Sequence, residues 1–344
     1  MKAFRFNQWH QAGQLENIPI PEPGPGEALI RIGGAGACHS DLHIMHEWTP
    51  ETLPQLAGWS LPFTLGHENA GWIEGGETAG MEIGAPVIIS PTWSCGKCRS
   101  CRAGATNYCD DPDYAASGGL GCNGGLAEYM VVPANTMVRL NSLEPADAAP
   151  LTDAGLTSYH AVKQCLPILT PDTAVVVIGV GGLGHLAVEF LSVLSGARII
   201  AVDRDEDALK MAAEKGADLC LPSDETTEEQ IKEATSGLGA MAVLDFVGID
   251  ATLAMASRSL RRMGRIVVVG IGGGVLSFSY TMLPHGATMM TVLGGSTGEL
   301  AEVVALAEAG KVTPHIQHFP LQEISTVYER LHANKIKGRA VLIP

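Results

Sequence analysis

The sequence predicts a two-domain α/β protein, and three observations support this fold class. The chain of 344 residues is too long for one ordinary domain but fits two. Short β-type runs fill residues 1 to about 150, whereas apolar strands alternate with amphipathic helices from Ala174 onward. The composition, with 41 glycines, 46% hydrophobic and 17% charged residues, is typical of a compact glycine-rich chain rather than a disordered one.

The N-terminal part predicts an antiparallel, barrel-like β domain with long insertions. Turn-forming residues such as the Pro- and Gly-rich segment 21–26 separate its apolar runs. The expected strands are 27–32, 70–74, 85–90, 127–132 and 137–139.

The part of the chain after Ala174 predicts a parallel, doubly wound sheet with helices between its strands. The expected strands are 174–179, 198–202, 218–221, 242–246, 265–270 and 287–293. The expected helices are 182–194, 206–215, 227–236, 251–261 and 299–309, after which only short strands are expected up to Pro344.

A glycine-rich motif predicts a dinucleotide-binding (Rossmann) domain in this second part. The pattern G-x-G-x-x-G follows an apolar strand and opens a helix, which is the context that gives it meaning. Its glycines allow a tight turn, a close approach to a pyrophosphate and helix–strand packing, and the helix N-terminus offers N–H groups to the phosphates. The motif residues are Gly179, Gly181, Gly182, Leu183 and Gly184.

An acidic residue near this motif favours NAD over NADP. Asp203 ends the next expected strand, where a carboxylate can bind the ribose 2′-hydroxyl and would repel a 2′-phosphate. Arg204 follows directly and weakens this preference, since an arginine can accept the phosphate. The alternative is a plain glycine-rich turn with an acidic surface residue.

Four cysteines at the spacing C-x2-C-x2-C-x7-C predict a structural zinc site. Cys95, Cys98, Cys101 and Cys109 can close a tetrahedron of thiolates, which leaves no position for a substrate. The other four cysteines are scattered singly, and the N-terminus shows no export signal. We therefore expect a reducing, cytoplasmic setting in which the clustered cysteines bind metal.

The charge balance argues against some partners. A net charge of -15 disfavours nucleic acids and anionic membranes, because phosphate binding needs clustered Lys and Arg. No apolar run in the sequence reaches membrane-spanning length.

A second metal site is indicated by Cys38 in G-A-C-H-S-D and by His67 and Glu68 in L-G-H-E. Taken alone, a cysteine is usually a small buried hydrophobe, and a histidine is usually a hydrogen-bonded core or surface group. Their combination with a four-cysteine loop and a nucleotide-binding domain favours an open, reactive metal site.

With these motifs and P-G-P-G-E at residues 23–27, the chain resembles the medium-chain, zinc-dependent alcohol dehydrogenase family over essentially its whole length, in particular bacterial NAD-dependent members acting on secondary alcohols. The resemblance implies a GroES-like β-barrel catalytic domain at 1–153 and 291–344 and a Rossmann domain at 154–290. It also implies NAD and two Zn²⁺ per chain, one catalytic and one structural.

The resemblance implies Cys38, His67 and Asp153 as ligands of the catalytic zinc. Asp153 stands where many members have cysteine, and it is a harder oxygen ligand. Its alternative role is that of a helix N-cap. Glu68 could orient the metal's surroundings or act as an exchangeable ligand.

The same resemblance implies how the reaction proceeds. Zinc lowers the pKa of an alcohol, and hydride passes to the nicotinamide. Ser40 takes the alcohol proton and passes it through the nicotinamide ribose to His43, although Ser40 could also act as a helix cap. His39 and Arg339 are expected at the cofactor phosphates, unless they are solvated surface charges. The positions that resemble those flanking the nicotinamide, or alternatively pack the core, are Thr157, Val247, Gly270 and Ile271.

The sequence indicates the substrate and the oligomeric state less specifically than it indicates the fold and the metal sites. Trp48, Trp93 and Leu293 fall near substrate-lining positions of the family, which is compatible with secondary or bulky apolar alcohols and ketones. A polyol or formaldehyde-type dehydrogenase is the alternative, and a non-catalytic NAD-binding protein is a remote one. The family implies a homodimer or homotetramer, for which the apolar segment 275–282 could pair as an edge strand between subunits.

Overall fold

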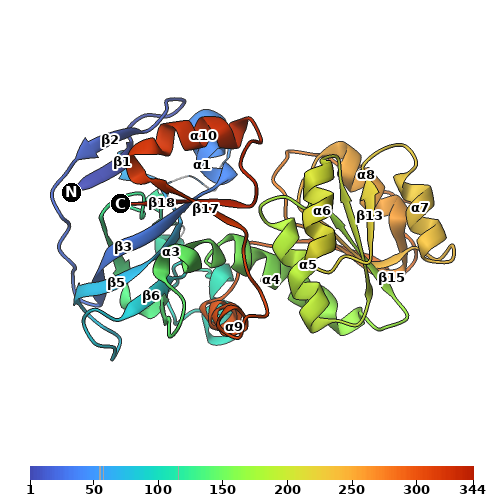
Figure 1. Ribbon diagram of the computed structural model, residues 1–344, viewed down its shortest axis with the longest axis horizontal. Helices are drawn as coiled ribbons and strands as arrows, with labels where there is room; N and C mark the ends of the chain where they lie inside the picture. The colour runs from blue at the N-terminus through green and yellow to red at the C-terminus, as the bar shows by residue number, and fades with distance from the viewer. Residues whose placement is uncertain (54–55, 57, 115) are drawn as a thin grey trace. The chain divides into compact units, whose positions relative to one another are not determined.

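The computed structural model describes residues 1–344 apart from 54–55, 57 and 115. The described residues form two compact units (Figure 1). The first contains Met1–Leu156 and Gly294–Pro344, and the second contains Thr157–Leu293. Among the described residues, no helix is long and apolar enough to cross a lipid bilayer.

The first unit is built on a largely antiparallel seven-stranded sheet in the order β10-β6-β5-β3-β18-β17, with β9 also paired to β3. A separate sheet has the order β2-β1-β4. The strands of these two sheets are β1 (Lys2–Phe6), β2 (Gln14–Asn17), β3 (Glu27–Ala37), β4 (Phe63–Thr64), β5 (Glu68–Gly76), β6 (Pro86–Ile89), β9 (Tyr129–Pro133), β10 (Met137–Arg139), β17 (Ile316–Pro320) and β18 (Arg339–Ile343). A separate two-stranded sheet pairs β7 (Ser117–Gly118) with β8 (Gly121–Cys122).

Strand β3 changes character along its length, and this change positions the first site residues. In its first half Ala28, Ile30 and Ile32 face the core, whereas Arg31 is exposed. In its second half every residue is buried, and glycines let other segments approach closely. A Cβ at Gly36 would lie only 1.9 Å from Oε2 of Glu68, so glycine is required there.

The helices of the first unit include one that we did not expect. They are α1 (His39–His46), α2 (Arg99–Arg102), α3 (Pro145–Ala148), α9 (Thr297–Glu308) and α10 (Ile324–His332). The expectation of only short strands after residue 309 was wrong, because α10 lies between β17 and β18. Its buried residues Ile324, Val327, Tyr328 and Leu331 have the i, i+3, i+4, i+7 spacing of an amphipathic helix.

The second unit is a six-stranded parallel sheet in the order β13-β12-β11-β14-β15-β16, which confirms the predicted doubly wound fold. The strands are β11 (Ala174–Ile178), β12 (Arg198–Asp203), β13 (Leu219–Pro222), β14 (Ala240–Asp245), β15 (Leu260–Val268) and β16 (Thr288–Thr291). The helices are α5 (Gly184–Leu194), α6 (Glu206–Glu214), α7 (Thr227–Ala234) and α8 (Asp250–Ser259). Helix α4 (Ala154–Cys165) begins at the end of the first unit's segment and continues into this one.

One local expectation for the second unit was wrong. Helix α8 ends at Ser259 rather than at residue 261, because β15 begins at Leu260 with an irregular register against β14. Residues 275–282, for which pairing between subunits is expected, form no strand within the single chain. Within this segment Val275, Phe278 and Tyr280 are 75%, 78% and 82% exposed.

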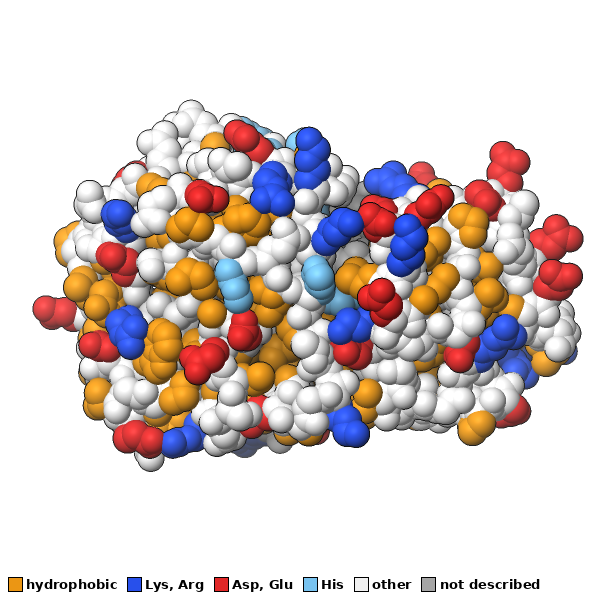
Figure 2. Space-filling view, viewed as in Figure 1, with side chains coloured by type: hydrophobic (Ala, Val, Ile, Leu, Met, Phe, Trp, Pro, Cys, Tyr) orange, Lys and Arg blue, Asp and Glu red, His pale blue; other side chains and the backbone are white. Residues whose placement is uncertain are grey.

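Each unit has its own apolar core. In the first, side chains of β3 and β5 pack with those of α1 and α10. In the second, β11, β12 and β14 pack against the flanking helices. On the face shown in Figure 2, acidic and basic side chains are interspersed around apolar ones, in keeping with a charged but not basic surface.

Candidate functional site

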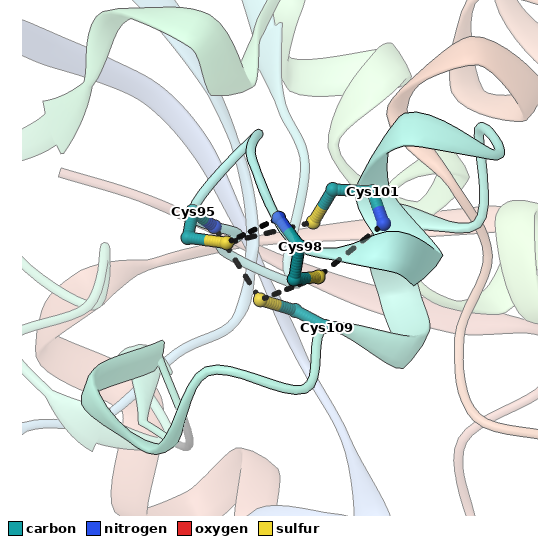
Figure 3. Close-up of side chains that lie close together, drawn as sticks. All are labelled: Cys95, Cys98, Cys101 and Cys109. Atoms are coloured by element: carbon teal, nitrogen blue, oxygen red, sulfur yellow. Dashed lines mark hydrogen bonds between the residues drawn. The ribbon is translucent and has the colours of Figure 1, made fainter.

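The four-cysteine loop, here called the cysteine lobe (residues 95–109), brings its four sulfur atoms together (Figure 3). All four Sγ atoms lie within 4.8 Å of one another, with Cys95–Cys101 and Cys98–Cys109 each separated by 4.0 Å. Four sulfurs held ~2.3 Å from one zinc ion at tetrahedral angles would lie ~3.8 Å apart. The donor set therefore fits a closed zinc site.

Backbone N–H groups of the cysteine lobe point at its sulfurs. Cys95 Sγ accepts from the N–H groups of Lys97 and Cys98 at 3.5 and 3.3 Å, and Cys98 Sγ accepts from Cys101 at 3.4 Å. The backbone N–H groups of Cys101 and Asp110 lower the pKa of Cys98 to about 7, whereas desolvation raises the pKa of Cys101 to about 12. These N–H groups stabilise thiolate, which is the metal-binding form.

The cysteine lobe is tied to the start of α9. Thr106, within the lobe, accepts a hydrogen bond from the backbone N–H of Thr297 at 3.1 Å. Just before the lobe, the Thr92 hydroxyl donates to the carbonyl of Gly295 at 3.2 Å. The lobe therefore holds together parts of the first unit that are distant in sequence, in keeping with a structural role.

A second cluster, here called the buried centre, brings together Cys38, His67, Glu68 and Asp153. Cys38 follows β3, His67 and Glu68 meet at the start of β5, and Asp153 directly precedes α4. Oδ2 of Asp153 lies 3.6 Å from both Cys38 Sγ and His67 Nε2, and one ligand atom from each of the four residues falls within 4.8 Å of the others. The structure thus gathers all three expected ligands together with Glu68.

The donor set of the buried centre fits a zinc ion. It offers one thiolate, one imidazole and carboxylate oxygen, which are the ligand types zinc prefers. Cys38 and His67 are 6% and 3% exposed and Glu68 is fully buried, so a cation here would offset buried negative charge. The carboxylate of Asp153, which directly precedes α4, is directed at Cys38 and His67.

Asp41 connects two of these residues, and the sequence analysis missed it as a site residue. Its fully buried carboxylate accepts from the backbone N–H of Cys38 at 3.0 Å and from the hydroxyl of Tyr328 at 2.9 Å, both on Oδ2. Its Oδ1 lies 3.3 Å from Nδ1 of His67. Burial alone would lower the pKa of His67, but Asp41 and Asp153 raise it well above its usual value. The arrangement is that of a carboxylate orienting a metal-binding histidine.

The helix that contains Asp41 also corrects an expectation. Helix α1 begins at His39 with Cys38 as its N-cap, so Ser40 is not the helix cap. The Ser40 hydroxyl lies 3.6 Å from Cys38 Sγ, which places it at the edge of the buried centre. His43, one turn further on, pairs through Nδ1 with Glu47 at 2.6 Å and stacks on Trp48.

Glu68 and Arg339 form a buried ion pair beside the same centre. Burial raises the pKa of Glu68 to about 8, against the opposing effect of the Arg339 charge. Burial would lower the pKa of Arg339, but the charges of Glu68, Cys38 and Asp153 raise it above its usual value. Arg339 is 3% exposed and is therefore not the solvated surface charge that was the alternative. His39 lies near enough that desolvation and then the Arg339 charge lower its pKa.

The three glycines of the nucleotide motif have the geometries that the motif requires. Gly179 has φ +83, and a Cβ at Gly184 would lie 1.9 Å from the carbonyl oxygen of Gly179. A Cβ at Gly181 would meet nothing within 4 Å, so its backbone is open to an approaching group. Asp203, at the end of β12, accepts from the N–H of Val180 at 2.7 Å, which sets the acid directly against the glycine turn, whereas Arg204 is exposed.

Two loops at the carboxyl ends of β14 and β15 interlock in the second unit. A Cβ at Gly270 would lie 2.3 Å from the carbonyl carbon of Val247, so the two loops are in backbone contact. Asp245, which the sequence analysis also missed, is fully buried and accepts from the N–H groups of Val247 and Gly248 at 2.9 and 3.0 Å. Ile271 is 60% exposed. Thr157 is buried at the start of the second unit's segment.

The expected substrate-lining residues have different environments. Trp48 stacks on His43 with ring centroids 5.0 Å apart. Trp93 is partly buried against the core of the first unit, where a Cβ at Gly118 would lie 3.1 Å from its ring. Leu293 is 60% exposed at the end of the second unit.

Comparison with known proteins identifies the family of the chain. The alcohol dehydrogenase GroES-like domain family matches residues 24–142, and the zinc-binding dehydrogenase family matches residues 182–309. A D-arabinose 1-dehydrogenase (NADP(+)) from Saccharolobus solfataricus is 36% identical, with 100% of this chain and 97% of the relative covered. An NAD-dependent alcohol dehydrogenase from Sulfurisphaera tokodaii is also 36% identical, with 100% of both chains covered.

A solved structure extends the likeness to three dimensions. The crystal structure of an alcohol dehydrogenase from the archaeon Aeropyrum pernix superimposes with a TM-score of 0.91 at 38% identity and covers 100% of both chains. Likeness at this identity and coverage, together with both domain families, leaves no ambiguity about descent. The chain belongs to the medium-chain, zinc-dependent alcohol dehydrogenase family and is an oxidoreductase of that family.

Proposed function

We propose that Cys38, His67 and Asp153 hold a catalytic zinc ion in an NAD-linked alcohol dehydrogenase. The observation that supports this most directly is the convergence of one thiol, one imidazole and one carboxylate within 4.8 Å at a buried position. Three protein ligands leave one coordination position for a substrate oxygen. Glu68, adjacent and held by Arg339, orients the metal's surroundings or exchanges onto it. The cysteine lobe holds the structural zinc.

Different residues of the chain have different roles around that centre. Zinc, when bound, supplies Lewis-acid stabilisation of negative charge on the alcohol oxygen, and NAD supplies the hydride acceptor. Ser40 accepts the alcohol proton at its hydroxyl, and His43 receives that proton at the outer end of the path. Glu47 neutralises the resulting charge on His43, since their side chains are 2.6 Å apart. His39 and Arg339 face the cofactor phosphates, His39 as a neutral hydrogen-bond donor because its pKa is lowered, and Arg339 as a charge that Glu68 partly offsets.

The cofactor preference that we propose is NAD. Asp203 would accept the ribose 2′-hydroxyl and repel a 2′-phosphate, and its position against the N–H of Val180 fixes it beside the phosphate turn. Arg204 is exposed and free of any such constraint from the sheet, so it remains a residue that could accept a 2′-phosphate. One relative that uses NADP and one that uses NAD share the same identity to this chain, so the choice must be measured.

The substrate that we propose is a secondary or bulky apolar alcohol, or the corresponding ketone. Partly buried Trp48 and Trp93 would provide apolar walls. A polyol or sugar substrate is the second candidate, favoured by the 36% identity to a D-arabinose dehydrogenase. A formaldehyde-type activity has less support, and a non-catalytic role is disfavoured by the convergence of all three ligands.

Assembly and location follow the same family expectation. A homodimer or homotetramer would cover the exposed apolar side chains of Val275, Phe278 and Tyr280. A cytoplasmic location fits the eight unpaired cysteines among the described residues.

The test combines each of the two cofactors, NAD and NADP, with a panel of alcohols. Turnover by metal-replete protein is measured as the absorbance of NADH or NADPH. Primary, secondary, cyclic and aryl alcohols, a pentose and formaldehyde adduct separate the candidates. Metal analysis of the same sample should give about two zinc ions per chain. Turnover of a pentose alone would replace the apolar-alcohol proposal, and no turnover with bound NAD and two zinc ions would exclude the dehydrogenase function itself.

A further inference from the structure

The buried centre has a donor from a distant part of the chain whose role the proposed function does not use. Tyr328 lies on α10 and is 5% exposed. Its hydroxyl donates to Oδ2 of Asp41 at 2.9 Å across a sequence separation of 287 residues. Helix α10 lies against α1, the helix that contains Asp41 (Figure 1).

We propose that the Tyr328 hydroxyl is a positioning residue for the catalytic metal, acting through Asp41 on His67 and Cys38. This inference rests on the proposed zinc site at Cys38, His67 and Asp153 and adds a part of the chain that the family motifs do not contain. The hydroxyl of Tyr328 donates its hydrogen bond to Asp41, so its effect on the clustered residues passes through a carboxylate.

The two carboxylate oxygens of Asp41 have different neighbours. Oδ2 accepts two hydrogen bonds, one from the Tyr328 hydroxyl and one from the backbone N–H of Cys38. Oδ1 lies 3.3 Å from His67 Nδ1 as an ion-pair contact, and neither atom has a hydrogen-bond partner among the described residues. The two donors on Oδ2 therefore set the rotation of the carboxylate and so the direction in which Oδ1 points.

The direction of Oδ1 decides how His67 presents itself to a metal. A carboxylate at Nδ1 favours the tautomer with the proton on Nδ1, which leaves the Nε2 lone pair free. Nε2 is the atom that faces Asp153, at 3.6 Å from its Oδ2. A carboxylate that could rotate would hold both the ring plane and the tautomer less firmly.

The surroundings make the Tyr328 hydroxyl hard to replace. Asp41 is fully buried, so water cannot easily substitute for a lost donor. Three further acidic or thiol groups, Cys38, Glu68 and Asp153, lie close by, which makes a neutral donor to Asp41 valuable. The ring of Tyr328 also packs near Phe4, with centroids 5.7 Å apart, and this contact holds the hydroxyl in place.

The variant that tests the inference is Tyr328→Phe, which removes the hydroxyl and keeps the ring against Phe4. Tyr159→Phe is the matched control, because Tyr159 is a second buried tyrosine, 6% exposed, that lies on α4 and packs on Phe190. The protein is loaded with zinc, then challenged with a chelator while zinc per chain is counted over time. In a second sample Co²⁺ replaces the more exchangeable metal, and its visible absorption reports ligand geometry.

The expected result is selective. Tyr328→Phe should lose one of two zinc ions about 10- to 100-fold more readily than wild type, shift the Co²⁺ spectrum and leave the other zinc ion untouched. Tyr159→Phe should match wild type in both measurements. In an Asp41→Asn background, Tyr328→Phe should add little, because the two residues act in one chain of contacts.

Three results would overturn the inference. Equal metal retention and an unchanged Co²⁺ spectrum in Tyr328→Phe would show that the hydroxyl positions nothing. Equal loss of both zinc ions would show general destabilisation instead. A wild-type protein that binds only the zinc of the cysteine lobe would overturn the proposed catalytic centre and this inference together, so the two failures are distinguishable.

Discussion

The two metal centres of the first unit are built in opposite ways. The cysteine lobe takes all its ligands from residues 95–109, and its sulfurs accept hydrogen bonds from backbone N–H groups of the same segment. The buried centre takes ligands from residues separated by as many as 115 positions, and its supporting contacts include side chains from distant segments. Its Asp41 accepts from a tyrosine 287 positions away.

This difference teaches what each centre depends on. The cysteine lobe needs only a short segment and its metal, so a substitution in it should first lower the stability of the fold. The buried centre forms only when β3, β5, α1 and α10 are assembled. A substitution in it should therefore first change the coordination of the metal and the rate of turnover.

The largest effect is expected from Cys38→Ala. Removing a ligand should abolish Lewis-acid assistance, worth about 4 kcal/mol or more, and lower kcat by at least ~10³-fold. The cysteine lobe should keep its zinc, so metal analysis should give about one zinc ion per chain with an almost unchanged melting curve. Activity within tenfold of wild type would remove Cys38 from the list of essential ligands.

The reciprocal change is Cys98→Ser, in the cysteine lobe. A serine oxygen is a poor replacement for a thiolate, and loss of the structural metal should cost ~3 kcal/mol, which lowers the melting temperature by roughly 6–12 °C. Protein that remains folded should still turn over alcohol at a rate close to wild type. If turnover fell as far as it does in Cys38→Ala, the two centres would be coupled and the comparison would fail.

The same contrast explains how much could be predicted from the sequence. The lobe's ligands share one spacing pattern, and the six parallel strands show themselves as apolar runs separated by helical patterns. Asp41 could not be recognised in this way, because an acid in the first turn of α1 is also what an ordinary helix start contains. Its role depends on Tyr328, which arrives on a helix that we did not expect.

Some signals were present but unused. The buried spacing of Ile324, Val327, Tyr328 and Leu331 is helical, and reading it would have predicted α10. Asp245 ends a buried strand, where an acid is costly unless backbone donors reach it. The interlocking of the loops after β14 and β15 could not be predicted, since it depends on backbone contacts between segments.

A moderate and selective effect is expected from Gly119→Ala, in the loop that supports His67. A Cβ there would lie 2.3 Å from the carbonyl oxygen of Gly66 and 2.8 Å from the backbone nitrogen of His67, at φ +84. Displacing this backbone should cost ~1–3 kcal/mol and weaken the buried metal without affecting the cysteine lobe. Chelator challenge with zinc counting would measure both effects.

Gly104→Ala is the matched control for that substitution. Gly104 lies in the cysteine lobe, has the same φ of +84 and would place its Cβ in open space. It therefore reports the backbone strain alone, expected at ~1 kcal/mol, with both metals retained. Equal behaviour of the two variants would mean that the contact with His67 contributes nothing to the buried centre.

The smallest effect is expected from Glu82→Gln, which tests whether acid sensitivity arises outside both centres. The Arg139 guanidinium donates hydrogen bonds to both carboxylate oxygens of Glu82, at 2.8 and 2.6 Å. These bonds lower the pKa of Glu82 to about 2. Because the folded-state pKa is depressed, the pair stabilises the fold above the ordinary glutamate pKa of about 4.3, and this contribution disappears as the pH falls towards 2. Glu82→Gln should therefore slightly lower the stability of the fold near neutral pH and flatten the pH dependence of stability between those two pKa values.

The Glu82–Arg139 pair is exposed, so 1 M salt should remove most of the difference between the variant and wild type in urea unfolding. An equally steep acid transition in both proteins would instead assign that transition to the thiolates and carboxylates of the two metal centres.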